Sequence, residues 1–321
     1  MAPVRAGSEA ELARLYEFVE GGYRTPSSAA RLRRGVRRRL ERLLGAKGQV
    51  DVVDRASAPD PLTAVYARDV AFLVPVSWCR NVSLFGFGPG AFDAWEATAR
   101  QVAVSPDVPA QETVLARFLE RFVPRTAAER LYSAPERDVS QGSRLHQVSA
   151  ADTKYFFPWS PAVEEWPATA PEDLRIRSHG PAGARLVELE VWRLKRLVAS
   201  VKAAGYRPPR NDGVRGQLLH AHGETRFLIR SGFHRVAVLS ALGHDAVPAR
   251  FASHAQRLMT LDQLPTWPLV RQGLFTRREA QLLVERLFTE DGRETAARLG
   301  LEPHPDAAHA PAPAPLVASP A

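Results

Sequence analysis

The 321-residue chain has almost no cysteine and no long hydrophobic run. Its one cysteine, Cys79, excludes an intrachain disulfide and a cysteine-rich zinc module. The first twenty residues carry four glutamates and no apolar run, unlike a secretory signal peptide. The longest apolar run, residues 70–79, is about half of the roughly 20 residues that a membrane helix needs, and Pro75 interrupts it. We therefore expect a cytoplasmic protein without a membrane span.

Positive charge is concentrated in two parts of the chain. The composition, 45% hydrophobic and 24% charged, is that of a folded globular protein, and the net charge is +8. Residues 31–42 carry a net charge of +6 and residues 174–252 carry +9, which leaves −7 on the remainder. Two basic regions on an acidic remainder predict anionic partners at two places.

The first half of the chain reads as a mixed region. Apolar spacing predicts helices within residues 8–47 and again at 91–102 and 111–122, whereas β-branched and aromatic runs predict strands at 70–76 and 82–87. Residues 133–184 are rich in Ser, Pro and Gly without periodicity, which is typical of a connection. We expect an N-terminal region of unknown function at 1–150 and a connecting segment at 151–184.

The second half has a clearer order of elements. Apolar residues at three- and four-residue spacing predict a helix from Leu186 that ends at Gly205. Strands at 217–220 and 225–229 flank a tight turn, and a helix at 234–242, a strand at 246–251 and helices at 277–288 and 293–299 follow. This order predicts an α+β fold, with a domain at 185–300 and a disordered Pro/Ala-rich tail at 301–321.

The segment Ser231-Gly-Phe-His-Arg235 joins a strand to a helix and is the main candidate site. The first backbone N–H groups of a helix have no partner within it, and the helix dipole favours an anion there. Gly232 has no side chain to block a phosphate group. Arg235 can donate two parallel hydrogen bonds to phosphate, and His234 can add a further donor. We therefore expect Ser231, Gly232, His234 and Arg235 to bind a nucleotide or another phosphorylated small molecule.

The stretch Ile229–Phe251, with the sequence IRSGFHRVAVLSALGHDAVPARF, resembles the signature of the ParB/sulfiredoxin-like superfamily. In that superfamily a G-x-H-R or G-x-R-R box opens a helix that binds nucleotide phosphates. Residues 194–208, which end in SVKAAGYRPP, resemble its upstream helix and exit. The resemblance covers residues 185–252. It implies a nucleotide ligand such as ATP, ADP or CTP, with Mg²⁺ as an accompanying ion.

The chain departs from several members of this superfamily. Sulfiredoxins carry a catalytic cysteine where this chain has Phe233, so their mechanism is excluded. Chromosome-partitioning members follow the box with a multi-helix DNA-reading domain, for which residues 253–302 are too few. Free-serine kinases often have an acidic residue where this chain has Ser231, and they use a carboxylate to accept the hydroxyl proton. For such a role the nearest candidates are Glu188, Glu190 and Glu224, of which we take Glu190 and Glu224 as candidate catalytic residues.

Three functions remain open from the sequence. The chain could be a small-molecule kinase or nucleotide hydrolase, or a module that senses a nucleotide without turnover. Alternatively it is a nucleic-acid-binding protein or ParB-like nuclease, in which the Arg-rich helix at 31–42 adds contacts to phosphate through Arg34, Arg37, Arg38 and Arg42. His220 and His222 share a strand face, but nearby arginines and the lack of a Cys or Asp as third ligand argue against a metal site, and we predict none.

Overall fold

The computed structural model describes residues 8–20, 58–67, 70–132, 139–165, 171–174, 178–206, 213–253 and 255–301. The Arg-rich helix expected at 31–42 lies outside these residues, as does the tail expected at 301–321 except for Leu301, which is buried in the core. Within the described part, no helix is long and apolar enough to cross a membrane.

The described chain combines helices with a mixed β-sheet, which confirms the α+β prediction. The helices are α1 (Glu9–Glu20), α3 (Pro61–Ala64), α4 (Ala94–Val104), α5 (Val114–Arg121), α6 (Ala127–Leu131), α8 (Ala184–Ala204), α9 (Phe233–Ala241), α10 (Pro268–Arg271), α11 (Arg277–Thr289) and α12 (Arg293–Arg298). Short 3₁₀ turns are η1 (Val76–Trp78), η2 (Ala110–Glu112), η3 (Arg144–His146), η4 (Glu172–Leu174) and η5 (Leu261–Thr266). The strands are β1 (Phe72–Pro75), β2 (Cys79–Arg80), β3 (Thr153–Tyr155), β4 (Glu164–Glu165), β5 (Val214–Ala221), β6 (Glu224–Ser231), β7 (Ala246–Phe251) and β8 (Leu258–Thr260).

The central sheet has the order β1-β7-β5-β6-β2, and β8 also pairs with β5. The hairpin of β5 and β6 is antiparallel and turns at His222 and Gly223, both of which have positive φ, as a type I′ turn requires. β7 returns parallel to β5 after α9. β1 and β2 come from before residue 150 and pair with β7 and β6, so the sheet crosses the boundary expected there.

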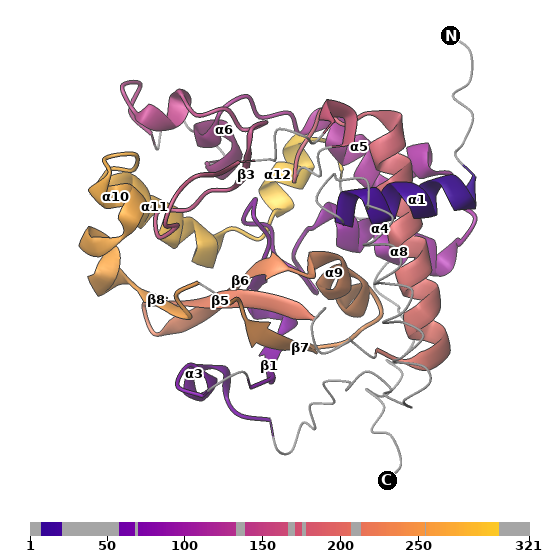
Figure 1. Ribbon diagram of the computed structural model, residues 1–321, viewed down its shortest axis with the longest axis horizontal. Helices are drawn as coiled ribbons and strands as arrows, with labels where there is room; N and C mark the ends of the chain where they lie inside the picture. Colours follow the sequence, from indigo (N-terminus) through magenta and orange to yellow (C-terminus); the bar gives the residue numbers. More distant parts are fainter. Residues whose placement is uncertain are drawn as a thin grey trace, which may run out of the picture.

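Helices cover both faces of this sheet. Side chains on a strand alternate between its faces, and accordingly Phe227 and Ile229 of β6 join one core cluster with α4, α8 and α9, whereas Leu228 joins a second cluster with α11. Figure 1 shows α1, α4 and α8 gathered on one side of the molecule and α10 and α11 on the opposite side. The α9 helix is therefore held between the sheet and the pair α4 and α8.

Most of the elements expected from periodicity are present. The α8 helix ends at Gly205 as predicted, β7 spans the expected residues 246–251, and α4, α5, α11 and α12 shift by a few residues at their ends. The N-terminal helix is confirmed as α1, which packs its apolar stripe on α8.

The prediction of a strand at 82–87 is wrong. The extended segment is β2, and it stops at Arg80. The Asn81 side-chain oxygen accepts hydrogen bonds from the backbone N–H groups of Ser83 (2.7 Å) and Phe85 (3.1 Å), and Leu84 adopts a positive φ of 71°. A side chain that bonds to its own backbone in this way offers the chain a turn in place of a strand. The apolar residues of the segment are still buried.

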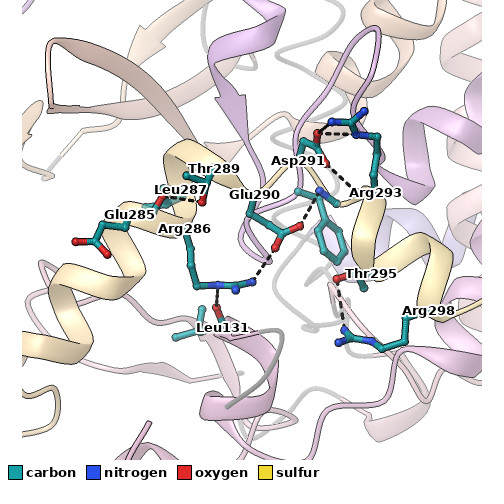
Figure 2. A network of polar contacts seen from close by, with 12 residues as sticks. Leu131, Glu285, Arg286, Leu287, Thr289, Glu290, Asp291, Arg293, Thr295 and Arg298 are labelled. Atoms are coloured by element: carbon teal, nitrogen blue, oxygen red, sulfur yellow. Dashed lines mark hydrogen bonds and ion pairs between the residues drawn. The ribbon is translucent and has the colours of Figure 1, made fainter. Parts of the chain in front are cut away.

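A polar network attaches the end of α11 to the first half of the chain (Figure 2). Arg286 donates to the carbonyl oxygen of Leu131 at 3.1 Å and forms an ion pair with Glu290 at 3.0 Å. Glu290 in turn accepts a hydrogen bond from the backbone N–H of Gly292 at 3.2 Å. These bonds fix the turn between α11 and α12, which packs against Phe92.

Candidate functional site

The candidate site lies where β6 passes through Gly232 into α9. Gly232 caps the helix in the left-handed conformation, with φ 82° and ψ 18°. A β-carbon at this position would lie 2.9 Å from Cα of Val214, at the start of β5. The glycine is therefore required by the contact between the two strands as well as by its own φ. The requirement for glycine at this position therefore does not depend on a bound phosphate.

The structure brings Ser231, Gly232, His234 and Arg235 together at the first turn of α9. Ser231 is exposed, and the other three are half-buried. The carbonyl oxygen of Gly232 accepts hydrogen bonds from the backbone N–H groups of Arg235 and Val236, so the N–H of Arg235 is already engaged within the turn.

Glu190 lies directly beside this turn, although it comes from α8. Its carboxylate is buried, and Oε2 accepts hydrogen bonds from Nε2 of His234 at 2.6 Å and from Nε1 of Trp95 at 3.0 Å. Oε1 accepts a bond from Arg193 at 2.8 Å. Burial by itself would raise the pKa of Glu190, but His234 and Arg193 outweigh burial and hold that pKa well below its usual range. Glu190 is therefore an ionised, fully partnered carboxylate.

Trp95 of α4 fixes the same turn by packing. Its ring lies edge-on to the ring of Phe233, with the ring centroids 5.3 Å apart. The ring centroids of Phe233 and His234 lie 4.0 Å apart. Further along α9, the hydroxyl of Ser240 donates to the buried Glu96 of α4 at 2.7 Å. The α4 helix thus holds the first and last turns of α9 in place.

Glu224, the other predicted carboxylate, is not brought to this site. It begins β6, and the eight residues of that strand separate it from Ser231 by about 23 Å at the usual rise per residue. Its side chain is 61% exposed and forms an ion pair with Arg226 at 2.9 Å. Arg34, Arg37, Arg38 and Arg42 lie outside the described residues.

Sequence reasoning missed Trp95 and Arg193. Trp95 is distant in the chain and carries no motif, so no local signal identifies it. A signal for the burial of Glu190 did exist, because Glu190 stands four residues from both Leu186 and Leu194, within the apolar stripe of the long helix. A carboxylate in such a stripe needs buried partners.

A cavity lies apart from this site. A cavity of about 510 Å³, with Arg144, Asp152 and Glu165 in its lining, is formed by segments that pack on the other face of the sheet. Among the described residues, no group of three or more His, Cys, Asp or Glu side chains could hold a metal ion.

No family model, curated protein or solved structure matches the chain. The resemblance to the ParB/sulfiredoxin-like superfamily therefore stays a prediction from the residues 185–252.

Proposed function

We propose that this chain is a ParB/sulfiredoxin-like protein that binds a nucleotide, or another phosphorylated small molecule, at the first turn of α9. The proposed reaction is phosphoryl transfer or nucleotide hydrolysis. The observation that carries the proposal is the junction of β6 and α9, where a left-handed glycine is followed by a histidine and an arginine at a helix N-terminus. Such a turn offers backbone N–H groups, a favourable dipole and the guanidinium group of Arg235 to one anion. The Nε2 atom of His234 is instead bonded to Glu190.

Two further arginines lie at the same end of the sheet as the junction. Arg215 of β5 lies opposite Ser231 in the register with β6 and opposite Arg250 in the register with β7. Both arginines are half-buried, at the same end of the sheet as Gly232. They alternate along their strands with Val214, Ala249 and Phe251, which join the core cluster that contains α9, so both point to the opposite face of the sheet. The positive charge offered to a ligand at the first turn of α9 is therefore that of α9 itself.

Any Mg²⁺ would be bound through the nucleotide. The described residues contain no cluster of carboxylates that could serve as a dedicated site. The ion would be held mainly by the phosphate oxygens, and there it would offset part of their charge.

The test is the Arg235→Ala variant, measured by calorimetry with ATP, ADP, CTP and pyrophosphate, with and without Mg²⁺. We expect the loss of charge-assisted hydrogen bonds worth roughly 1.5–3 kcal/mol, which is about ten- to a hundredfold in affinity. The matched control is Arg277→Ala, which removes the same charge from an exposed position on α11, on the other face of the sheet.

Two results would contradict the proposal. One is an Arg235→Ala protein that unfolds more readily in urea but binds these ligands as tightly as the wild type, since the arginine would then be structural. The other is a wild type that binds duplex DNA in a salt-dependent manner and none of the four ligands, in which case the nucleic-acid function takes its place.

A further inference from the structure

Glu190 fixes the position of the hydrogen on the His234 ring. An ionised carboxylate can only accept hydrogen bonds. Because Oε2 of Glu190 lies 2.6 Å from Nε2 of His234, that nitrogen must carry the hydrogen. The hydrogen bonds from Trp95 and Arg193 stabilise the ionised carboxylate and hold it in this orientation. In the neutral imidazole the lone pair is therefore on Nδ1.

The lone pair on Nδ1 faces away from the buried carboxylate. Within the described residues, Nδ1 makes no hydrogen bond, and it is not among the buried polar atoms that lack a partner. The side chain is 18% exposed, in contrast to 2% for Glu190. An imidazole held by a buried carboxylate on one nitrogen and open on the other is the arrangement in which histidine accepts protons during catalysis.

We propose that Glu190 and His234 form a proton-transfer dyad, in which Nδ1 of His234 takes the proton from a water molecule that attacks the terminal phosphoryl group of a bound nucleoside triphosphate. This inference rests on the proposed function. It names the reaction as hydrolysis, and it changes the role expected for Glu190 from proton acceptor to positioning residue.

The step balances without a further reactant. The O–H bond of water breaks, and its proton goes to Nδ1 of His234. The water oxygen forms a bond to the terminal phosphorus, while the bond from that phosphorus to the bridging oxygen breaks and its electron pair leaves with the nucleoside diphosphate. His234 is then an imidazolium whose charge is compensated by Glu190, and it returns the proton to the departing products or to solvent.

The charged groups nearest to the His234 ring come from α8 and α9. From α8, Glu190 bonds to the ring and is itself paired with Arg193, and on α9 the next residue along the chain is Arg235. From α4 the neighbour is the neutral Trp95, and the nearby Glu96 is engaged by Arg100 and Ser240. The carboxylate of Glu190 is thus the direct counter-charge of the protonated ring.

The test compares Glu190→Gln with Glu188→Gln, which makes the same change at a half-buried position on the same helix. Phosphate release from ATP and CTP is measured with Mg²⁺, and nucleotide affinity is measured separately by calorimetry. In Glu190→Gln we expect turnover to fall about a hundredfold or more, with affinity within about threefold of the wild type. We also expect the acid limb of the pH–rate profile to move to lower pH, because the protonated ring loses its counter-charge. Glu188→Gln should retain wild-type turnover.

A measurement on the unmodified protein covers the case in which Glu190→Gln fails to fold. Two-bond ¹H–¹⁵N spectra of histidine-labelled wild type, assigned with His234→Asn, report which ring nitrogen carries the hydrogen. We expect it on Nε2. A hydrogen on Nδ1 of the neutral ring overturns the dyad, as does a wild type that binds ATP or CTP without releasing phosphate. A wild type that binds no nucleotide refutes the proposed function itself, and calorimetry identifies that outcome separately.

Discussion

The buried carboxyl of Asp93 should make the stability of this protein fall as the pH rises from acidic to neutral. Asp93 caps α4: Oδ1 accepts a hydrogen bond from the backbone N–H of Glu96 at 2.9 Å, and Oδ2 accepts one from Nδ2 of Asn81 at 2.7 Å. Its side chain is 1% exposed. Burial, together with the nearby charge of Glu96, raises the pKa of Asp93 to about 7 despite these hydrogen bonds.

The sign and size of the effect follow from this pKa. The folded protein binds the proton more tightly than the unfolded chain, whose Asp93 has an ordinary pKa near 3.8. The stabilisation that proton binding by Asp93 gives the folded protein is fully present below the unfolded-state pKa of 3.8. It is lost as the pH rises through the folded-state pKa of about 7. The difference between the two pKa values corresponds to a loss of about 4 kcal/mol at most across this range.

Asp93→Asn removes the titration and keeps most of the cap. The amide oxygen can still accept from Glu96, but the amide nitrogen faces Nδ2 of Asn81, which cannot rotate because its oxygen already accepts from Ser83 and Phe85. Two N–H donors that face each other without an acceptor lower the free energy of unfolding by about 1–3 kcal/mol at every pH. The stability advantage of the wild type over the variant should therefore be largest near pH 4 and decline, or reverse, by about pH 8.

The assay is urea unfolding of both proteins at intervals between about pH 4 and about pH 8, with the free energy of unfolding compared at each pH. Asp60→Asn is the matched control, since Asp60 caps α3 in the same way at an exposed position. If the difference between wild type and Asp93→Asn stays constant over this range, or grows with rising pH, the argument from burial is refuted.

Two further predictions concern a turn and the cysteine. Gly292→Ala should destabilise the protein by about 1–3 kcal/mol or more in urea unfolding, because Gly292 has φ 89° and a β-carbon would lie 2.2 Å from the carbonyl oxygen of Phe92. Gly273→Ala, at φ 69° with open space around it, should cost less, and equal costs would show that the close contact is unimportant. Cys79 should react with a thiol reagent only as the protein unfolds, because burial raises the pKa of its thiol to about 12, with Arg80 opposing; rapid labelling of the native protein would contradict this.

The local order of elements could be read from the sequence because it depends on short-range physics. The apolar stripe of α8 and its Gly205 end, the turn at His222 and Gly223, and the strand and helix on either side of Gly232 each depend on residues close together in the chain. The same local reasoning failed at 82–87, where one side chain, that of Asn81, bonds to the following backbone and replaces a strand with a turn.

Only the tertiary structure decided which residues meet at the candidate site. The packing of α4 and α8 against α9 brings Trp95 and Glu190 to His234, and the pairing of β5 with β6 gives Gly232 its neighbour Val214. The same pairing places Glu224 at the far end of the strand from the site. Helical and strand periodicity tell which face of an element is buried, but they carry no information on which distant segment covers that face, and the partner of a buried charge depends on that choice.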